Sequence, residues 1–255
     1  MKYLLLTGCM ALCLFGCGGG GDGGTVFSAP TPVVTASPGG YWIGADTELE
    51  PVVMLVSELG DFHVFRWLFD RSVGTLSVNE SDTVNGALGI SGMPGGQSSS
   101  GLTDCKLTGS VNERVSMLLD VRCRNTQDQE VLTTLSVEYD TRYDRESSLS
   151  TIAGNYRFDI GNVFNITGDG QIFSQEGQAG CITLGDVWLI DDRFNAYEIE
   201  LIFIECPGVD RTLYYETLTG LAMLDNTVTP ERLIYSVSGE TENNFVVISG
   251  WADRL

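Results

Sequence analysis

The sequence has very few of the groups that enzymes use for acid–base or nucleophilic chemistry. Its 255 residues include one histidine, and no segment has the Gly-x-Ser-x-Gly form that presents a nucleophilic serine. That histidine, His63, would share a strand face with three aromatic residues, Phe65, Trp67 and Phe69. We expect a packed strand side chain there, so a Ser-His-Asp triad is not predicted and the chain is interpreted as non-enzymatic.

Basic residues are also scarce. The chain has 14 lysine and arginine residues against 34 aspartate and glutamate residues, a formal net charge of −20 at pH 7. Such a surface repels nucleic acids and anionic lipid headgroups, so no nucleic-acid partner is predicted. Neighbouring carboxylates occur at Asp191–Asp192, Glu198/Glu200 and Glu240/Glu242. We expect them to form a solvated face, and a hydrolase that uses two carboxylates in a cleft is the weaker alternative.

Long apolar runs are absent beyond the start of the chain. Residues 1–16 place Lys2 before a short uncharged apolar stretch, which is typical of a secretory signal and too short to span a bilayer. The segment Leu14-Phe15-Gly16-Cys17 resembles the lipobox of bacterial lipoproteins. This resemblance implies that Cys17 becomes the first residue of the mature chain and carries a diacylglycerol and an N-acyl chain such as palmitate.

The residues after Cys17 fit a membrane-anchored protein. Residues 17–39 are rich in glycine, proline, serine and threonine, which predicts a flexible tether. Gly18, where an aspartate would favour the inner membrane, implies an outer-membrane lipoprotein of a Gram-negative bacterium. Whether it faces the periplasm or the cell exterior stays open. The membrane, through the N-terminal lipid, is the one partner predicted here.

Short strands are predicted from residue 40 onward, because turn residues recur between β-branched and aromatic residues. Gly60-Asp61 and Gly168-Asp169-Gly170 each lie between two apolar segments, as in a β-hairpin. Residues 197–203 alternate between apolar and polar, as in a half-buried strand. One short helix is expected at residues 147–153, with Ser147 or Ser148 as N-cap and Gly154 just past its end.

An internal repeat divides this region in two. Residues 39–44 read GGYWIG and residues 153–158 read AGNYRF, and each is followed by a predicted hairpin. The fold class is therefore predicted as all-β, with two tandem antiparallel barrels or sandwiches of the calycin-like type. The first module is expected to cover residues 40–145 and the second residues 146–255.

Four cysteines remain once Cys9 and Cys13 leave with the signal and Cys17 is lipidated. An even number in an exported protein predicts two disulfides, and three pairings are possible. In each half a cysteine is followed four residues later by glycine, and a strand then ends in a second cysteine. This repeat favours the pairs Cys105–Cys123 and Cys181–Cys206 in equivalent hairpins. A zinc site is disfavoured because there is no Cys-x-x-Cys motif.

The segment that joins the modules carries a further resemblance. Residues 42–44 have the form Trp-x-Gly, and residues 139–156 read YDTRYDRESSLSTIAGNY. Together they resemble a family of two-module Gram-negative surface lipoproteins with no assigned activity. The matching linker positions are Tyr139, Asp140, Tyr143, Asp144, Ser148, Leu149, Ile152, Ala153, Gly154 and Tyr156. The resemblance implies location and architecture, and it supplies no catalytic residues or cofactor.

Two further patterns bear a partial likeness to binding sites. Residues 165–176 partly match a calcium-binding loop through Asn165, Thr167, Asp169 and Glu176, but the flanks lack helical periodicity. A hairpin turn explains them better, so no metal site is predicted. Most aromatic residues are expected in the cores, although a few of them in a barrel mouth would hold an apolar ligand. Those considered are Tyr41, Trp42, Phe62, Phe65, Trp67, Trp188, Tyr214, Tyr215 and Trp251.

Three functional hypotheses follow. The first is a non-enzymatic binding or interaction module on the envelope, the second is a carrier of a small hydrophobic ligand inside a barrel, and the third is a carboxylate-dependent hydrolase. Barrels filled by their own side chains favour the first, an aromatic-lined cavity favours the second, and two carboxyls facing each other in a cleft with an apolar wall favour the third.

The proposed lipidation makes a direct prediction. Cys17→Ser removes the thiol that would carry the lipid, so the protein is expected to leave the membrane fraction and lose incorporation of radiolabelled palmitate. Each buried methylene of an acyl chain contributes about 0.8 kcal/mol to membrane binding, so the shift should be nearly complete. Fractionation of cell envelopes measures it, with Cys105→Ser as the control. Membrane retention of the Cys17→Ser protein contradicts the prediction.

Overall fold

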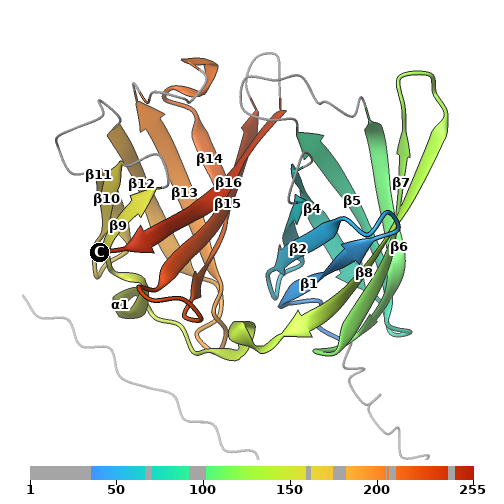
Figure 1. Cartoon of the computed structure of the whole chain (residues 1–255), viewed down its shortest axis with the longest axis horizontal. Helices are drawn as coiled ribbons and strands as arrows, with labels where there is room; N and C mark the ends of the chain where they lie inside the picture. The colour runs from blue at the N-terminus through green and yellow to red at the C-terminus, as the bar shows by residue number, and fades with distance from the viewer. Residues whose placement is uncertain are drawn as a thin grey trace, which may run out of the picture. The chain divides into compact units, whose positions relative to one another are not determined.

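The computed structural model of the protein describes residues 36–66, 71–91, 102–158, 162–174, 182–204, 206, 211–240 and 245–255. They form two closed, eight-stranded antiparallel barrels in tandem (Figure 1). In each barrel successive strands pair with one another and the last strand pairs with the first, as in calycin-like barrels. The predicted fold class is therefore confirmed. Both barrels belong to one compact unit, Val34–Leu255.

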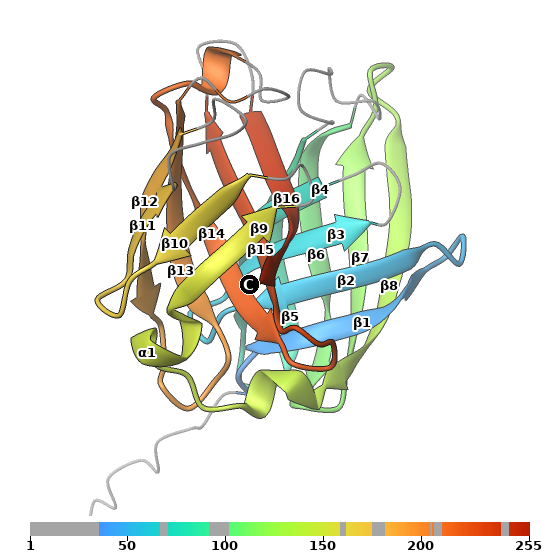
Figure 2. The same cartoon turned by 60° about the vertical axis from the view of Figure 1, so that its left-hand side comes forward.

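The strands divide equally between the barrels. The first barrel contains β1 (Gly40–Asp46), β2 (Pro51–Val56), β3 (Asp61–Arg66), β4 (Arg71–Val78), β5 (Thr83–Ser91), β6 (Thr103–Asn112), β7 (Ser116–Arg124) and β8 (Glu130–Asp140). The second contains β9 (Gly154–Phe158), β10 (Val163–Ile166), β11 (Gln171–Ser174), β12 (Ile182–Leu189), β13 (Tyr197–Ile204), β14 (Thr217–Asp225), β15 (Arg232–Glu240) and β16 (Phe245–Arg254). Pairing of β9 with β16 closes this barrel (Figure 2).

Three short helical turns complete the described chain. The 3₁₀ turn η1 (Thr141–Asp144) and the helix α1 (Leu149–Ile152) join the barrels, and a second 3₁₀ turn, η2 (Arg211–Leu213), precedes β14. The predicted helix is thus present but shorter than residues 147–153. Its N-cap is Ser148, whose side chain accepts a hydrogen bond from the Thr151 N–H at 3.0 Å. No helix among the described residues is long and apolar enough to cross a bilayer.

Apolar side chains of the described residues pack on one another inside each barrel, as in eight-stranded barrels whose interior is occupied by side chains. The alternation predicted for residues 197–203 is present, with its apolar members buried. In the second barrel Phe164 stacks on Phe158 and Tyr156, with ring centroids 4.4 and 5.5 Å apart. Interior side chains of the first barrel that are at most 1 % exposed include Trp42, Met54, Phe62, Leu107, Met117 and Leu119.

The two barrels repeat each other closely at the turn between their second and third strands. Gly60 and Gly170 both have a φ of +92°. The carbonyl oxygen of each accepts a backbone hydrogen bond from the fourth strand of its barrel, at 2.9 and 2.7 Å. Ser57 and Thr167 open the two turns, and each side-chain oxygen accepts a bond from the N–H four residues later. This turn therefore sets the residue-by-residue alignment of the repeats.

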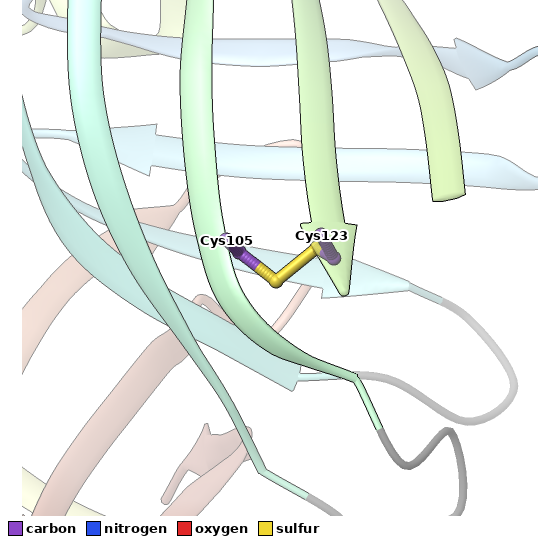
Figure 3. The surroundings of a disulfide bond; sticks show 2 residues. All are labelled: Cys105 and Cys123. Atoms are coloured by element: carbon purple, nitrogen blue, oxygen red, sulfur yellow. A yellow bond between two sulfur atoms is a disulfide. The ribbon is translucent and has the colours of Figure 1, made fainter. Parts of the chain in front are cut away.

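That alignment corrects the expected equivalence of the cysteines. Cys105 on β6 and Cys123 on β7 form a disulfide, as predicted (Figure 3). Cys181 and Cys206, however, flank β12 and β13, which are the fourth and fifth strands of their barrel rather than the sixth and seventh. The shared cysteine-to-glycine spacing therefore does not mark equivalent hairpins. Cys206 is disulfide-bonded, and because Cys181 lies outside the described residues its pairing stays a prediction.

The repeated turn makes a test of stability possible. A Cβ atom at Gly170 would lie 2.4 Å from the Val187 carbonyl oxygen and would also occupy the left-handed region, whereas one at Gly168 meets nothing within 4 Å. Gly170→Ala is expected to lower the free energy of unfolding by about 1–3 kcal/mol, and Gly168→Ala by less than about 0.5 kcal/mol. Urea denaturation measures both, and equal losses would contradict the assignment.

Candidate functional site: a cleft between the barrels

A third apolar core lies between the barrels, outside both interiors. It is built from outward-facing side chains of β1 and β2 on one side and of β14 on the other. The run Val52–Val56 and the run Leu221–Leu224 therefore have apolar residues buried on both faces of the strand. The buried members of this core are Tyr41, Leu55, Tyr143, Phe194, Ala196, Leu221 and Met223.

The linker and one loop of the second barrel tie this core together. Tyr143 in η1 stacks on Phe194, which lies in the loop between β12 and β13, with ring centroids 5.4 Å apart. Next to it, Asn195 accepts a bond from the Leu224 N–H at 3.1 Å and donates to the carbonyl oxygens of Leu224 and Arg142 at 2.7 and 3.1 Å. The loop thus holds the linker and β14 at once.

Arg142 of the linker provides the main charged contact between the barrels. Its guanidinium lies 2.8 Å from Asp140 and 3.2 Å from Asp225 of the second barrel, and it stacks over the Tyr41 ring at 4.7 Å. Hydrogen bonds from Arg142 hold the pKa of Asp140 below its usual value. Burial alone would raise the pKa of Asp225, but bonds from Thr227 and the charge of Arg142 lower it overall. Both carboxylates are therefore ionised at neutral pH and keep this contact.

His63 faces out of the first barrel and makes a polar contact with the second. It alternates on β3 with Phe62 and Val64, which point into the barrel. Its side chain is only 5 % exposed, and its Nδ1 lies 2.8 Å from the Oγ of Ser236 on β15. The expectation of a packed strand histidine is thus met, but the packing comes from the neighbouring barrel.

The protonation of this pair follows from its surroundings. Burial lowers the pKa of His63 from 6.5 to about 4, so the ring is neutral at pH 7. The Ser236 hydroxyl has His63 as its only hydrogen-bond partner among the described residues, so its proton is satisfied when it is donated to Nδ1. This pairing assigns the ring proton to Nε2. The Nε2–H group has no acceptor among the described residues.

The His63 ring lines a cleft of about 310 Å³ between the barrels. Strand register places the first wall: Asp61 lies opposite Thr75, and His63 lies opposite Val73. Strand register also places the second wall, on β13, β14 and β15. Glu198, Leu221 and Ser236 are cross-strand neighbours on these three strands, and Thr219 on β14 lies opposite Ser238 on β15. The lining is Ser57, Leu59, Asp61, His63, Val73, Gly74, Thr75, Ile190, Glu198, Thr219, Gly220, Leu221 and Ser238.

Each barrel contributes one carboxylate to the described cleft, and neither contributes a positively charged side chain. Asp61 and Glu198 are exposed, and the residues that line the described cleft include no lysine or arginine. Glycosidase chemistry needs a carboxylic acid kept protonated by an apolar pocket, and exposed carboxylates do not have one. In the described part of the chain, no three histidine, cysteine or acidic side chains form a group suited to a metal ion. The arrangement is suited to binding a polar or cationic group.

The residues singled out from the sequence are spread over the chain. Cys17, Glu176, Cys181, Trp67, Phe69 and Glu242 lie outside the described residues, and so does the side chain of Phe65. Asn165 is on β10 and donates to Asn155 at 2.8 Å, while Thr167 and Asp169 hydrogen-bond to each other within a hairpin turn. Asp191 forms an ion pair with Arg193, which lowers the pKa of the carboxyl to about 2.

Most aromatic residues of the described chain lie in the cores, as expected, and Tyr214 packs against the core of the second barrel. Tyr41, Trp42 and Phe62 are buried, whereas Trp188, Tyr215 and Trp251 are exposed. The guanidinium of Arg232 lies 5.3 Å from the centroid of the Trp251 ring, so this outward-facing aromatic side chain forms a cation–π contact. The larger share of the aromatic core comes instead from residues not singled out, namely Tyr143, Tyr156, Phe158, Phe164, Phe194, Tyr197, Phe203 and Tyr235.

Neither the protein-family models nor the curated proteins with which the chain was compared include a match to it.

The buried histidine predicts a specific pH dependence. Between pH 6.5 and 4 the unfolded chain binds a proton at His63 that the folded chain excludes, so stability should fall as the pH drops through this range. The expected loss is up to about 3 kcal/mol, from the pKa difference of about 2.5. Urea denaturation at pH 7, 5.5 and 4 measures it. In His63→Gln, which cannot titrate, this part of the slope should disappear, and an unchanged slope would contradict the assignment.

Proposed function

We propose that the protein is an outer-membrane lipoprotein, anchored through Cys17, that acts as a non-enzymatic binding module. The junction at Leu14–Cys17 and the glycine-rich tether behind it support the anchor. The packing of the described interior side chains carries the proposal for function, because it favours binding on the outer surface over binding inside a barrel. The cleft beside His63 is the site that we assign to it.

The two alternatives have less support. A carrier of a hydrophobic ligand needs a cavity within a barrel, and the interior positions hold large side chains packed on one another. A hydrolase needs carboxyl groups in different environments, so that one is protonated and the other ionised. Asp61 and Glu198 share a cleft, but both are exposed. Binding without chemistry is therefore the simplest use of the cleft.

A photo-crosslinking experiment tests this proposal in intact cells. Leu59 lines the cleft and is 79 % exposed, so p-benzoylphenylalanine at this position should label whatever the cleft binds. Leu118 on β7 is the control, because it is 52 % exposed and does not line the cleft. The expected result is an adduct at Leu59 and none at Leu118. No adduct at Leu59, or equal labelling at both positions, would overturn the assignment of the cleft.

A further inference from the structure

The negative charge of the cleft favours a ligand of positive charge. Asp61 of the first barrel and Glu198 of the second lie on opposite walls, and neither has an ion-pair partner among the described residues. The described lining has no basic side chain, and the whole chain carries a net charge of −20. Field lines from so acidic a protein favour the entry of a cation into such a cleft.

The other lining residues decide between a metal ion and an organic cation. Four apolar side chains, Leu59, Val73, Ile190 and Leu221, occupy the same cleft. These side chains are poor ligands for a metal ion, since calcium, for example, needs six or more oxygen atoms. They make good contacts with methylene groups. An ammonium group on an apolar stem satisfies both the carboxylates and these walls.

His63 adds an independent requirement. Its ring is almost fully buried, and its Nε2–H donor lacks an acceptor within the described chain while the ring lines the cleft. The Nε2 atom is not one of the buried polar atoms without a partner, so it reaches the solvent of the cleft. A ligand that presents a carbonyl or hydroxyl oxygen can therefore take the place of water at this donor. The volume of about 310 Å³ is at the lower end of the range for small-molecule sites, about 300–1,000 Å³.

We propose that the cleft binds a primary ammonium carried on a short apolar stem next to a carbonyl or hydroxyl oxygen, the chemistry of a lysine side chain and its backbone. The ammonium lies between Asp61 and Glu198, the stem packs on the apolar walls, and the oxygen accepts from His63. This inference rests on the proposed binding function and names the ligand chemistry for the same cleft. The source is either a lysine of a protein partner or a free amine of the same kind.

Ligand-observed NMR with the full mature protein in nonionic detergent tests the proposal. The probe is Nα-acetyl-lysine-N-methylamide, for which a ligand of its size predicts a dissociation constant of about 1 mM. The norleucine analogue lacks the ammonium and should bind at least about ten-fold more weakly. Pentylamine keeps the ammonium and stem but lacks the carbonyl groups, and it should be weaker by about three-fold. Equal binding of the norleucine analogue would overturn the proposal.

Variants connect the binding to the named side chains. Asp61→Asn and Glu198→Gln should each weaken binding of the lysine probe about five-fold, as expected for a solvent-exposed ion pair. The matched control is Glu200→Gln, which removes the same charge two residues along β13 and does not line the cleft. His63→Gln should weaken binding of the lysine probe and leave that of pentylamine unchanged. Equal losses in the Glu200 variant would attribute the binding to the general field and overturn the proposal.

The crosslinking experiment separates this proposal from the one it rests on. An adduct at Leu59 that survives in the Asp61→Asn/Glu198→Gln double variant keeps the binding function and overturns the ammonium assignment. An adduct that is lost in the double variant supports both, and its mass distinguishes a protein partner from a free amine. If Leu59 gives no adduct and the lysine probe does not bind, both proposals fail.

Discussion

The burial of outward-facing apolar side chains between the two barrels is the interaction on which the rest of the described structure depends. A closed barrel satisfies its own backbone hydrogen bonds and needs no neighbour for that purpose. Here, however, Leu55, Leu221 and Met223 point away from their barrels and would be exposed apolar surface without the partner. Full burial of such a side chain contributes about 1.5–3 kcal/mol. The contact between the barrels therefore resembles a protein core, and both the cleft and the position of His63 follow from it.

The parts of this arrangement that depend on local signals were predictable from the sequence. The alternation in residues 197–203 predicts β13 and its buried face, and the glycines of the two hairpin turns predict where β2 and β10 end. The burial of His63 was also expected. Its contact with Ser236 was not, because the two residues are 173 positions apart and meet only when the barrels dock. For the same reason the cleft has no local sequence signal.

One available signal was missed. Residues 52–56 and 221–224 are apolar without interruption, whereas a strand with one solvent-exposed face alternates between apolar and polar residues. Such runs predict strands covered on both sides, and they identify β2 and β14 as the strands that meet between the barrels. The loop before β13 is the other trace of docking in the sequence. Its counterpart in the first barrel is a tight turn, and the extra residues place Phe194 against Tyr143. Cysteine spacing, in contrast, was misleading about the repeat.

The alignment of the repeats shows that the contact between the barrels has a direction. The first barrel contributes residues of its first five strands, β1 to β5, and the second contributes residues of its last four, β13 to β16, so the two surfaces are different. A head-to-tail contact of this kind does not close on itself and, with identical units, would continue into an array. The equivalent positions differ in polarity: Asn165 stands where the first barrel has Leu55, and Ser110 and Asn112 stand where the second has Leu221 and Met223. The free face of each barrel thus lacks the apolar side chains that form the contact, although Leu118 and Phe173, the strand neighbours of Ser110 and Asn165, are exposed there.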